Sequence, residues 1–125
     1  MKVTWKDEPE EHDFPAAAAY LSLLLPDDAV DAAVASLRRA TCTTRKAKDI
    51  LRASGLALLP KDNPHVAGDL EKVREDKSLS PILLVRGDVR RGQPLLVADG
   101  YHRVCASYHL DENTDIPCRL GAVPE

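Results

Sequence analysis

The sequence predicts an α+β domain in which a helical N-terminal part packs on a small mixed sheet. Two observations predict the helical part and the strands of the sheet. Alanine- and leucine-rich segments with helical spacing fill residues 14–40, and two apolar runs bounded by turn residues lie at 81–87 and 93–99. A third observation, a further helical pattern between 93–99 and a last apolar stretch at 116–120, places one helix among the strands.

Length and composition are those of one globular domain. The chain has 125 residues, of which 44% are hydrophobic and 30% charged, and it has no apolar run long enough to span a membrane. The first 13 residues are acidic and do not resemble a secretory signal, so we expect a cytoplasmic protein without a membrane partner. The expected layout is one domain over 1–125, with an N-terminal arm (1–13), a helical extension (14–43) and a core (44–120). The arm is expected to be either loosely attached or an edge segment around Val3 and Trp5.

The helical extension is expected to hold two helices. The first would start at Pro15, which suits a first helical position, and end before Pro26. The second would take Asp27 or Asp28 as its N-cap and would place two arginines in its last turn, where the helix dipole favours cations. Its apolar stripe consists of Val30, Ala33, Val34 and Leu37.

A third helix is expected over 44–55, with Thr44 as its cap and Gly55 as its stop. Lys48 and Arg52 are four residues apart and would share one face. They either extend separately into solvent or gather to meet an anion. A loop at 60–64 would then lead into a fourth helix.

The fourth helix is expected over 65–77, with Val66, Leu70 and Val73 on its apolar face. The runs at 81–87 and 93–99 are expected to pair as a hairpin, and 116–120 is expected to form a last strand.

Asp99-Gly100 lies between two apolar segments and could be a hairpin turn or the start of a helix. The residues that follow do not alternate as a strand would. Instead, apolar side chains recur with helical spacing, which predicts strand, turn and helix. These side chains are Tyr101, Val104, Cys105 and Tyr108.

This geometry predicts an anion site at the N-terminus of the last helix. The amides after Gly100 would lack helical partners, and the dipole places partial positive charge there. His102 and Arg103 stand in this first turn, where cations are disfavoured unless an anion lies nearby. The alternative is that Asp99 is only the N-cap and that Arg103 pairs with a local carboxylate.

The segment DGYHR, Asp99 to Arg103, followed by a helix and Ile116-Pro117, resembles the ParB N-terminal/sulfiredoxin-like superfamily over about residues 44–120. It is especially similar to the DGHHR form of that superfamily's free-serine kinases, and the whole chain looks like a group of small bacterial proteins within it. The resemblance implies a nucleoside triphosphate whose phosphates contact the Gly100 and Tyr101 amides, His102 and Arg103.

The departures from the superfamily exclude some of its activities. Tyr101 stands where sulfiredoxins carry their nucleophilic cysteine, so sulfinic-acid repair is not expected. Val104 and Cys105 replace further arginines of the partition proteins, and no room remains for their helix-turn-helix domain. Three separated cysteines and four histidines without ligand spacing predict no metal site.

The leading hypothesis is a phosphotransferase or nucleotidase that uses ATP or another nucleoside triphosphate with Mg²⁺. Asp99 would accept a proton or orient a water, and Lys48, Arg52 and His65 are further candidate ligands. The alternative is a non-catalytic nucleotide- or anion-sensing module with a protein partner or a homodimer. The net charge of −3 disfavours nucleic-acid binding.

Overall fold

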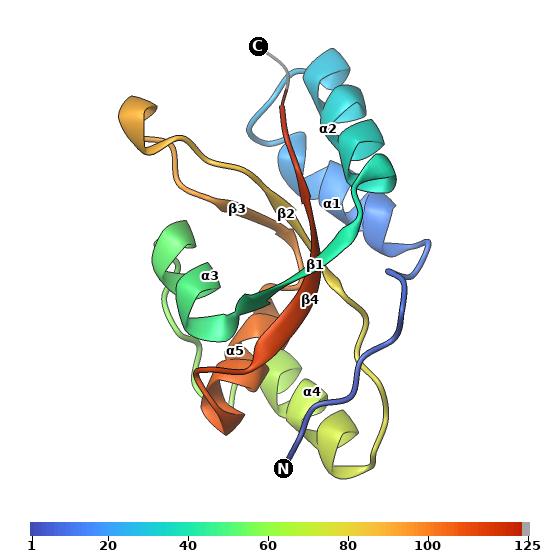
Figure 1. Ribbon diagram of the computed structural model, residues 1–125, viewed down its shortest axis with the longest axis vertical. Helices are drawn as coiled ribbons and strands as arrows, with labels where there is room; N and C mark the ends of the chain where they lie inside the picture. The colour runs from blue at the N-terminus through green and yellow to red at the C-terminus, as the bar shows by residue number, and fades with distance from the viewer. Residues whose placement is uncertain (124–125) are drawn as a thin grey trace.

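A four-stranded mixed sheet with helices on both faces forms the domain (Figure 1), and the expected α+β class is confirmed. The computed structural model describes residues 1–123. Its α-helices are α1 (Asp13–Leu21), α2 (Asp27–Arg39), α3 (Ala47–Ser54), α4 (Pro64–Arg74) and α5 (Tyr101–Leu110). Its strands are β1 (Cys42–Lys46), β2 (Ile82–Val85), β3 (Leu96–Asp99) and β4 (Asp115–Gly121), and a 3₁₀ turn, η1, spans Val89–Arg91.

The strand order is β1-β4-β2-β3. β2 and β3 pair antiparallel, which confirms the predicted hairpin, whereas β2 and β4 are parallel and β4 and β1 are antiparallel. The parallel pair sits at the centre of the sheet, and every residue of β2 is buried. A strand covered on both faces needs a continuous apolar run, and this explains the sequence of β2.

Two apolar cores lie on opposite faces of the sheet. Side chains alternate along β2, so Ile82 and Leu84 pack beneath α3, α4 and α5, while Leu83 and Val85 pack beneath α1 and α2. The apolar faces expected for the second and fourth helices are confirmed in these cores. Val30, Ala33 and Leu37 are buried in one core, Val66 and Leu70 in the other, and Val73 in a small cluster beside them.

The start expected for the third helix is wrong. Thr44 lies in β1, in register with Pro117 of β4, and α3 begins only at Ala47. β-Branched Thr43 and Thr44 suit a strand, but the partner that makes them one is more than seventy positions away in the sequence. The C-terminal prediction is correct, because Gly55 ends α3 with φ +68°.

The ends of the first helices also differ from the prediction. α1 begins at Asp13 rather than Pro15 and stops at Leu21, well before Pro26. Pro26 itself occupies the N-cap position of α2, so neither following aspartate is the cap, although both lie in the first turn. The helical extension cannot reach residue 43, because β1 has already begun.

The first residues form the expected edge segment around Val3 and Trp5 rather than a loosely attached arm. Val3 is buried, and Trp5 forms a bridge beside Leu79. The Lys6 amide donates to the Leu79 carbonyl at 2.8 Å, and the Leu79 amide donates to the Thr4 carbonyl at 3.0 Å. This pairing holds residues 3–6 against the segment that precedes β2. The arm therefore forms part of the surface around the start of α5.

Among residues 1–123 the three cysteines are free thiols, with Cys105 and Cys118 buried and Cys42 exposed. No helix in this part of the chain is long and apolar enough to cross a bilayer.

Candidate functional site

The chain turns from strand to helix at Gly100, as predicted. β3 ends at Asp99 and α5 starts at Tyr101. Gly100 has φ +112°, and a Cβ there would lie 2.3 Å from Cγ2 of Ile82. Only glycine satisfies both the backbone angle and the close approach, so this residue sets where α5 begins.

The N-terminus of α5 has no side-chain cap from the described part of the chain. Asp99 is therefore not the N-cap, and that half of the alternative is wrong. Amides in the first turn of such a helix lack helical acceptors and carry the positive end of the dipole. An uncapped terminus is stabilised by water or by an anion from solution.

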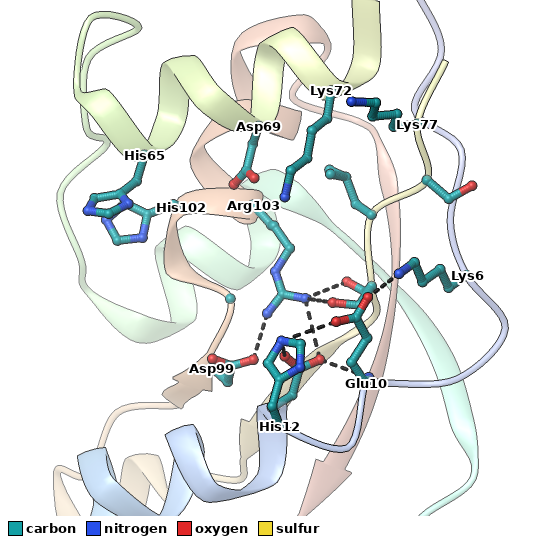
Figure 2. Close-up of a pocket in the computed structure, with 15 residues that line it drawn as sticks. Lys6, Glu10, His12, His65, Asp69, Lys72, Lys77, Asp99, His102 and Arg103 are labelled. Carbon is teal, nitrogen blue, oxygen red and sulfur yellow. Dashed lines mark hydrogen bonds and ion pairs between the residues drawn. The ribbon is translucent and has the colours of Figure 1, made fainter. Parts of the chain in front are cut away.

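A pocket of about 620 Å³ opens at this terminus (Figure 2). It is enclosed by the N-terminal segment, α4, the residues before β2, and the start of α5. Its charged lining consists of Lys6, Lys72, Lys77 and Arg103, and of Glu10, Asp13, Asp69 and Asp99, together with His12, His65 and His102. The formal charges cancel while the histidines are neutral, so imidazole protonation makes the pocket positive.

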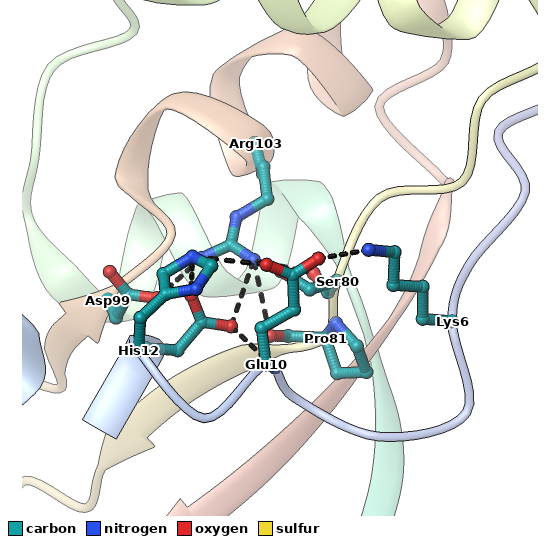
Figure 3. Close-up of polar contacts among 8 residues, drawn as sticks. Lys6, Glu10, His12, Ser80, Pro81, Asp99 and Arg103 are labelled. Carbon is teal, nitrogen blue, oxygen red and sulfur yellow. Dashed lines mark hydrogen bonds and ion pairs between the residues drawn. The ribbon is translucent and has the colours of Figure 1, made fainter.

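The Arg103 guanidinium forms hydrogen bonds and ion pairs with other residues of the chain (Figure 3). Its Nη2 donates to Oδ2 of Asp99 at 2.6 Å, and its Nη1 donates to the Ser80 carbonyl at 2.8 Å and to the Ser80 hydroxyl. Nη1 also lies 3.4 Å from the Pro81 carbonyl and 3.8 Å from Oδ2 of Asp13. The guanidinium thus ties β3, α1 and the segment before β2 to α5. The second half of the alternative, a pairing of Arg103 with a local carboxylate, is confirmed, because Asp99 lies four residues earlier in the chain.

Asp99 is a perturbed carboxyl group. Burial raises its pKa above the usual value, the Arg103 guanidinium opposes the shift, and the nearby Asp13 carboxylate adds to it. Asp13 is itself buried at the start of α1. Asp99 therefore retains its proton to higher pH than an isolated aspartate does.

Two histidines form the opposite wall of the pocket. The rings of His65 on α4 and His102 on α5 lie 4.7 Å apart, and Lys72 and Asp69 project beside them (Figure 2). Burial lowers the pKa of His102, and the neighbouring His65 lowers it further. His102 is therefore mainly neutral in the free protein at pH 7 and gains charge readily when an anion approaches.

Asp69 faces these groups without a direct partner. Its carboxylate makes no hydrogen bond or ion pair with any residue from 1 to 123. Burial raises its pKa, and the more distant charges of Lys72, Arg103, His102 and His65 only partly oppose this. A half-buried carboxylate without a bonded partner costs stability.

The wall formed by α4 had a sequence signal of its own, of which the predicted site included only His65. His65, Asp69 and Lys72 recur with helical spacing on the polar face of α4, opposite Val66 and Leu70. The Asn63 side chain accepts from the amides of residues 65 and 66 at 3.0 and 3.2 Å, so it fixes where this face begins. α4 starts at Pro64 and ends at Arg74, shorter than the expected 65–77.

The structure does not bring all the expected ligands together. Gly100, His102, Arg103, Asp99 and His65 line the pocket. The pocket lining does not include Lys48 or Arg52, which are exposed on α3. Arg52 lies 3.6 Å from Asp49, within its own helix.

Tyr101, whose amide was expected to contact the phosphates, is also not among the residues that line the pocket. Its hydroxyl donates to the Ala57 carbonyl and so holds the loop after α3. The lining residues Glu10, His12 and Asp13 gave no sequence signal, because nothing local to residues 1–13 indicates that they face α5.

Asp69→Asn is expected to stabilise the protein at neutral pH, by an amount of the order of 1 kcal/mol. The folded-state pKa of Asp69 is raised, so ionised Asp69 costs stability once the pH rises above its ordinary 3.8. The advantage of the variant should therefore be present at pH 7 and shrink toward pH 4. Urea unfolding at both pH values checks this, and a less stable variant at pH 7 would contradict it.

The chain matches no protein-family model, no curated protein and no solved structure. A function for this chain must therefore be inferred from the geometry and chemistry of the pocket.

Proposed function

We propose that the chain binds a phosphate-bearing small molecule, with a nucleoside triphosphate as the leading class, in the pocket at the start of α5. One observation carries the proposal: an uncapped helix N-terminus opens onto a wall that bears two imidazoles and an ammonium. Such termini bind phosphate because amides and dipole act together. The resemblance of DGYHR to the superfamily's nucleotide-binding motif agrees with this placement.

Each residue at the start of α5 would have its own part in binding. Gly100 allows the phosphate to approach the backbone, and the first amides of α5, including that of Tyr101, donate to its oxygens. His102, His65 and Lys72 would neutralise the charge. Arg103 acts as a positioning residue, because its guanidinium is already held by Asp99 and Ser80.

Mg²⁺ is compatible with this pocket. The described residues contain no group of three potential metal-ligating side chains. However, Mg²⁺ bound to a triphosphate takes most of its ligands from phosphate and water and needs only one or two carboxylates. Asp69, which has no bonded partner within residues 1–123, fits that requirement. The ion would supply charge neutralisation on the phosphates.

If the protein is a phosphotransferase, the acceptor hydroxyl forms a bond to the terminal phosphorus while the bond to the leaving diphosphate breaks. The hydroxyl proton then needs an acceptor. The raised pKa of Asp99 suits a group that takes up a proton, and Asp69 is the second candidate. The non-catalytic alternative is a nucleotide sensor that uses the same contacts.

Binding is tested by titrating ATP or CTP, each with Mg²⁺, into the native protein and into His102→Gln and Lys72→Met. We expect each substitution to weaken binding about tenfold, the value of one charge-assisted contact. Lys48→Met removes an exposed lysine outside the pocket and should bind as the native protein does. Equal affinities in all four proteins, or no binding by the native protein, would overturn the proposed site.

The affinity should depend on pH through His102. This imidazole faces His65 and Asp69 of α4 and Arg103 of its own helix, and its pKa lies below 6.5 in the free protein. Because phosphate favours the imidazolium, binding should take up protons and tighten several-fold between pH 8 and about pH 6. His102→Gln should flatten this dependence, and identical pH profiles would exclude His102 as a ligand.

A measurement of ATP or CTP turnover distinguishes the phosphotransferase hypothesis from the sensor hypothesis. Release of inorganic phosphate, or phosphate transfer to an added hydroxyl compound, that is lost in Asp99→Asn supports the phosphotransferase. Tight nucleotide binding without either product supports the sensor.

A further inference from the structure

A second concave surface lies between α3 and the loop that joins β2 to β3. Two adjoining hollows of about 240 and 760 Å³ share Ala53, Arg86, Leu95 and Leu120 in their linings. Together they form one groove, which runs from β1 past the C-terminal end of α3 to the tip of the hairpin. We call it the α3–hairpin groove. None of its lining residues belongs to the pocket at the start of α5.

The floor of the groove is apolar. Leu95 and Leu120 are half-buried there, next to Ile50 and Leu84 of the buried core. The Leu95 amide donates to the Ala53 carbonyl at 3.1 Å, which fixes the hairpin against the end of α3. At the tip, Val89 is 92% exposed beside the same groove. Apolar side chains collected in a concave surface favour a partner that brings apolar groups of its own.

The walls of the groove carry uncompensated positive charge. Arg45 and Arg86 form no ion pair with any carboxylate of residues 1–123. The two acidic lining residues are already engaged, because Asp49 lies 3.6 Å from Arg52 and Asp88 accepts from Arg90 at 3.1 Å. A chain with net charge −3 thus keeps a positive groove, which attracts acidic groups.

One strand that contributes to the groove lining is an edge strand of the sheet. β1 is the first strand in the sheet order, so one of its edges has no strand beside it, and all five of its residues are exposed. Arg45 belongs to this strand. Such an edge can pair with an extended peptide through main-chain hydrogen bonds.

We propose that the α3–hairpin groove binds an extended, acidic peptide segment of another protein, in which carboxylate side chains alternate with apolar ones. Carboxylates would meet Arg45 and Arg86, and the apolar side chains would fill the floor. Single-stranded nucleic acid fits less well, because the groove lacks aromatic residues on which bases could stack.

A second copy of this chain is the weaker occupant. Its acidic stretch, residues 7–13, is already used within its own fold. Glu8 pairs with Arg119, Glu10 pairs with Lys6, and Glu11 lies 2.8 Å from Arg38. Releasing this segment would break all three ion pairs and the contacts that Asp13 makes with Arg103.

Selection from a library of displayed random peptides of about ten residues tests the proposal. We expect the selected peptides to be rich in Glu, Asp and large apolar residues, and to bind Arg86→Glu and Arg45→Glu at least tenfold more weakly. Lys48→Glu makes the same charge change on α3 outside the groove and should leave binding intact. Thermal unfolding of the variants confirms that they are folded.

Three results would overturn the proposal. The first is that no peptide is enriched, and the second is that basic or neutral peptides are selected. The third is that acidic peptides are selected but bind Arg45→Glu and Arg86→Glu as tightly as the native protein. A labelled oligothymidylate measured by fluorescence anisotropy distinguishes nucleic acid. If it binds through Arg86 and no acidic peptide does, the groove is a nucleic-acid site. If sedimentation shows a dimer that Arg86→Glu dissociates, the occupant is a second copy.

Discussion

Arg103→Ala is expected to lower the free energy of unfolding by about 3–5 kcal/mol, the cost of leaving buried carboxylates without their partner. The Arg103 side chain is only 12% exposed, and those of Asp13 and Asp99 are 7% and 19% exposed. Alanine also leaves the Ser80 carbonyl without its donor. The structure therefore makes this residue an anchor that joins α5 to three other segments.

Urea unfolding at pH 7 measures the loss, with Arg52→Ala as the matched control. Arg52 is 87% exposed and has one distant partner, so its removal should change the free energy by no more than about 0.5 kcal/mol. Adding Asp99→Asn to Arg103→Ala should recover part of the loss, because one unpaired charge is removed. A loss below about 1 kcal/mol, or no recovery in the double variant, would show that the carboxylates do not depend on Arg103.

The stability lost in Arg103→Ala is expected to be larger at neutral pH than at acidic pH. Without the guanidinium, the pKa of Asp99, already raised by burial, has its main opposing influence removed and rises further. The carboxyl group then binds its proton in the folded state at higher pH than in the unfolded state. The penalty is therefore fully present at neutral pH and declines as the pH falls toward the ordinary value of 3.8.

Gly100→Ala is expected to lower the free energy of unfolding by about 3 kcal/mol, from backbone strain and overpacking together. The backbone angle of +112° is unfavourable for alanine. The new Cβ would also lie 2.3 Å from Cγ2 of Ile82, whose side chain is fully buried beneath α5. Relief requires the start of α5 to move away from β2, so phosphate binding should weaken as well.

Gly68→Ala is the control for this substitution. Gly68 lies within α4, and a Cβ there would have no atom within 4 Å. Alanine should therefore stabilise the helix by about 0.5–1 kcal/mol. Urea unfolding of both variants measures the contrast. Equal effects of the two substitutions would mean that α5 adjusts its start without cost.

Much of the candidate site could be predicted from local patterns. The stripe from Tyr101 to Tyr108 identified α5 against the hairpin signal of Asp99-Gly100, and the uncapped terminus is a consequence of that choice. Basic residues in the first turn of α5 indicated an anion. For Arg103 the pairing with Asp99 was the stated alternative to a phosphate contact, whereas its second carboxylate, Asp13, belongs to a segment ninety residues earlier and had no sequence signal.

The structure of β1 and of the N-terminal segment could not be predicted, because each depends on a partner that is distant in the sequence. β1 is a strand because β4 lies beside it, and the N-terminal segment is ordered because Leu79 pairs with it. Neither partner is near in sequence. Asp69 and Lys72 could have been predicted as site residues, because their helical spacing with His65 places all three on one polar face of α4.

The α+β class, the hairpin, the glycine turn and the apolar faces of the helices follow from local sequence patterns, because each depends on periodicity or on one residue's backbone freedom. The contacts between charges of distant segments, in contrast, follow from the packing of the folded chain. The fold places Asp13 against the local pair of Asp99 and Arg103, and His65 against His102, because packing on the sheet brings distant segments within a few ångströms. Ion pairs, pockets and pKa shifts depend on those distances, and no local pattern specifies them.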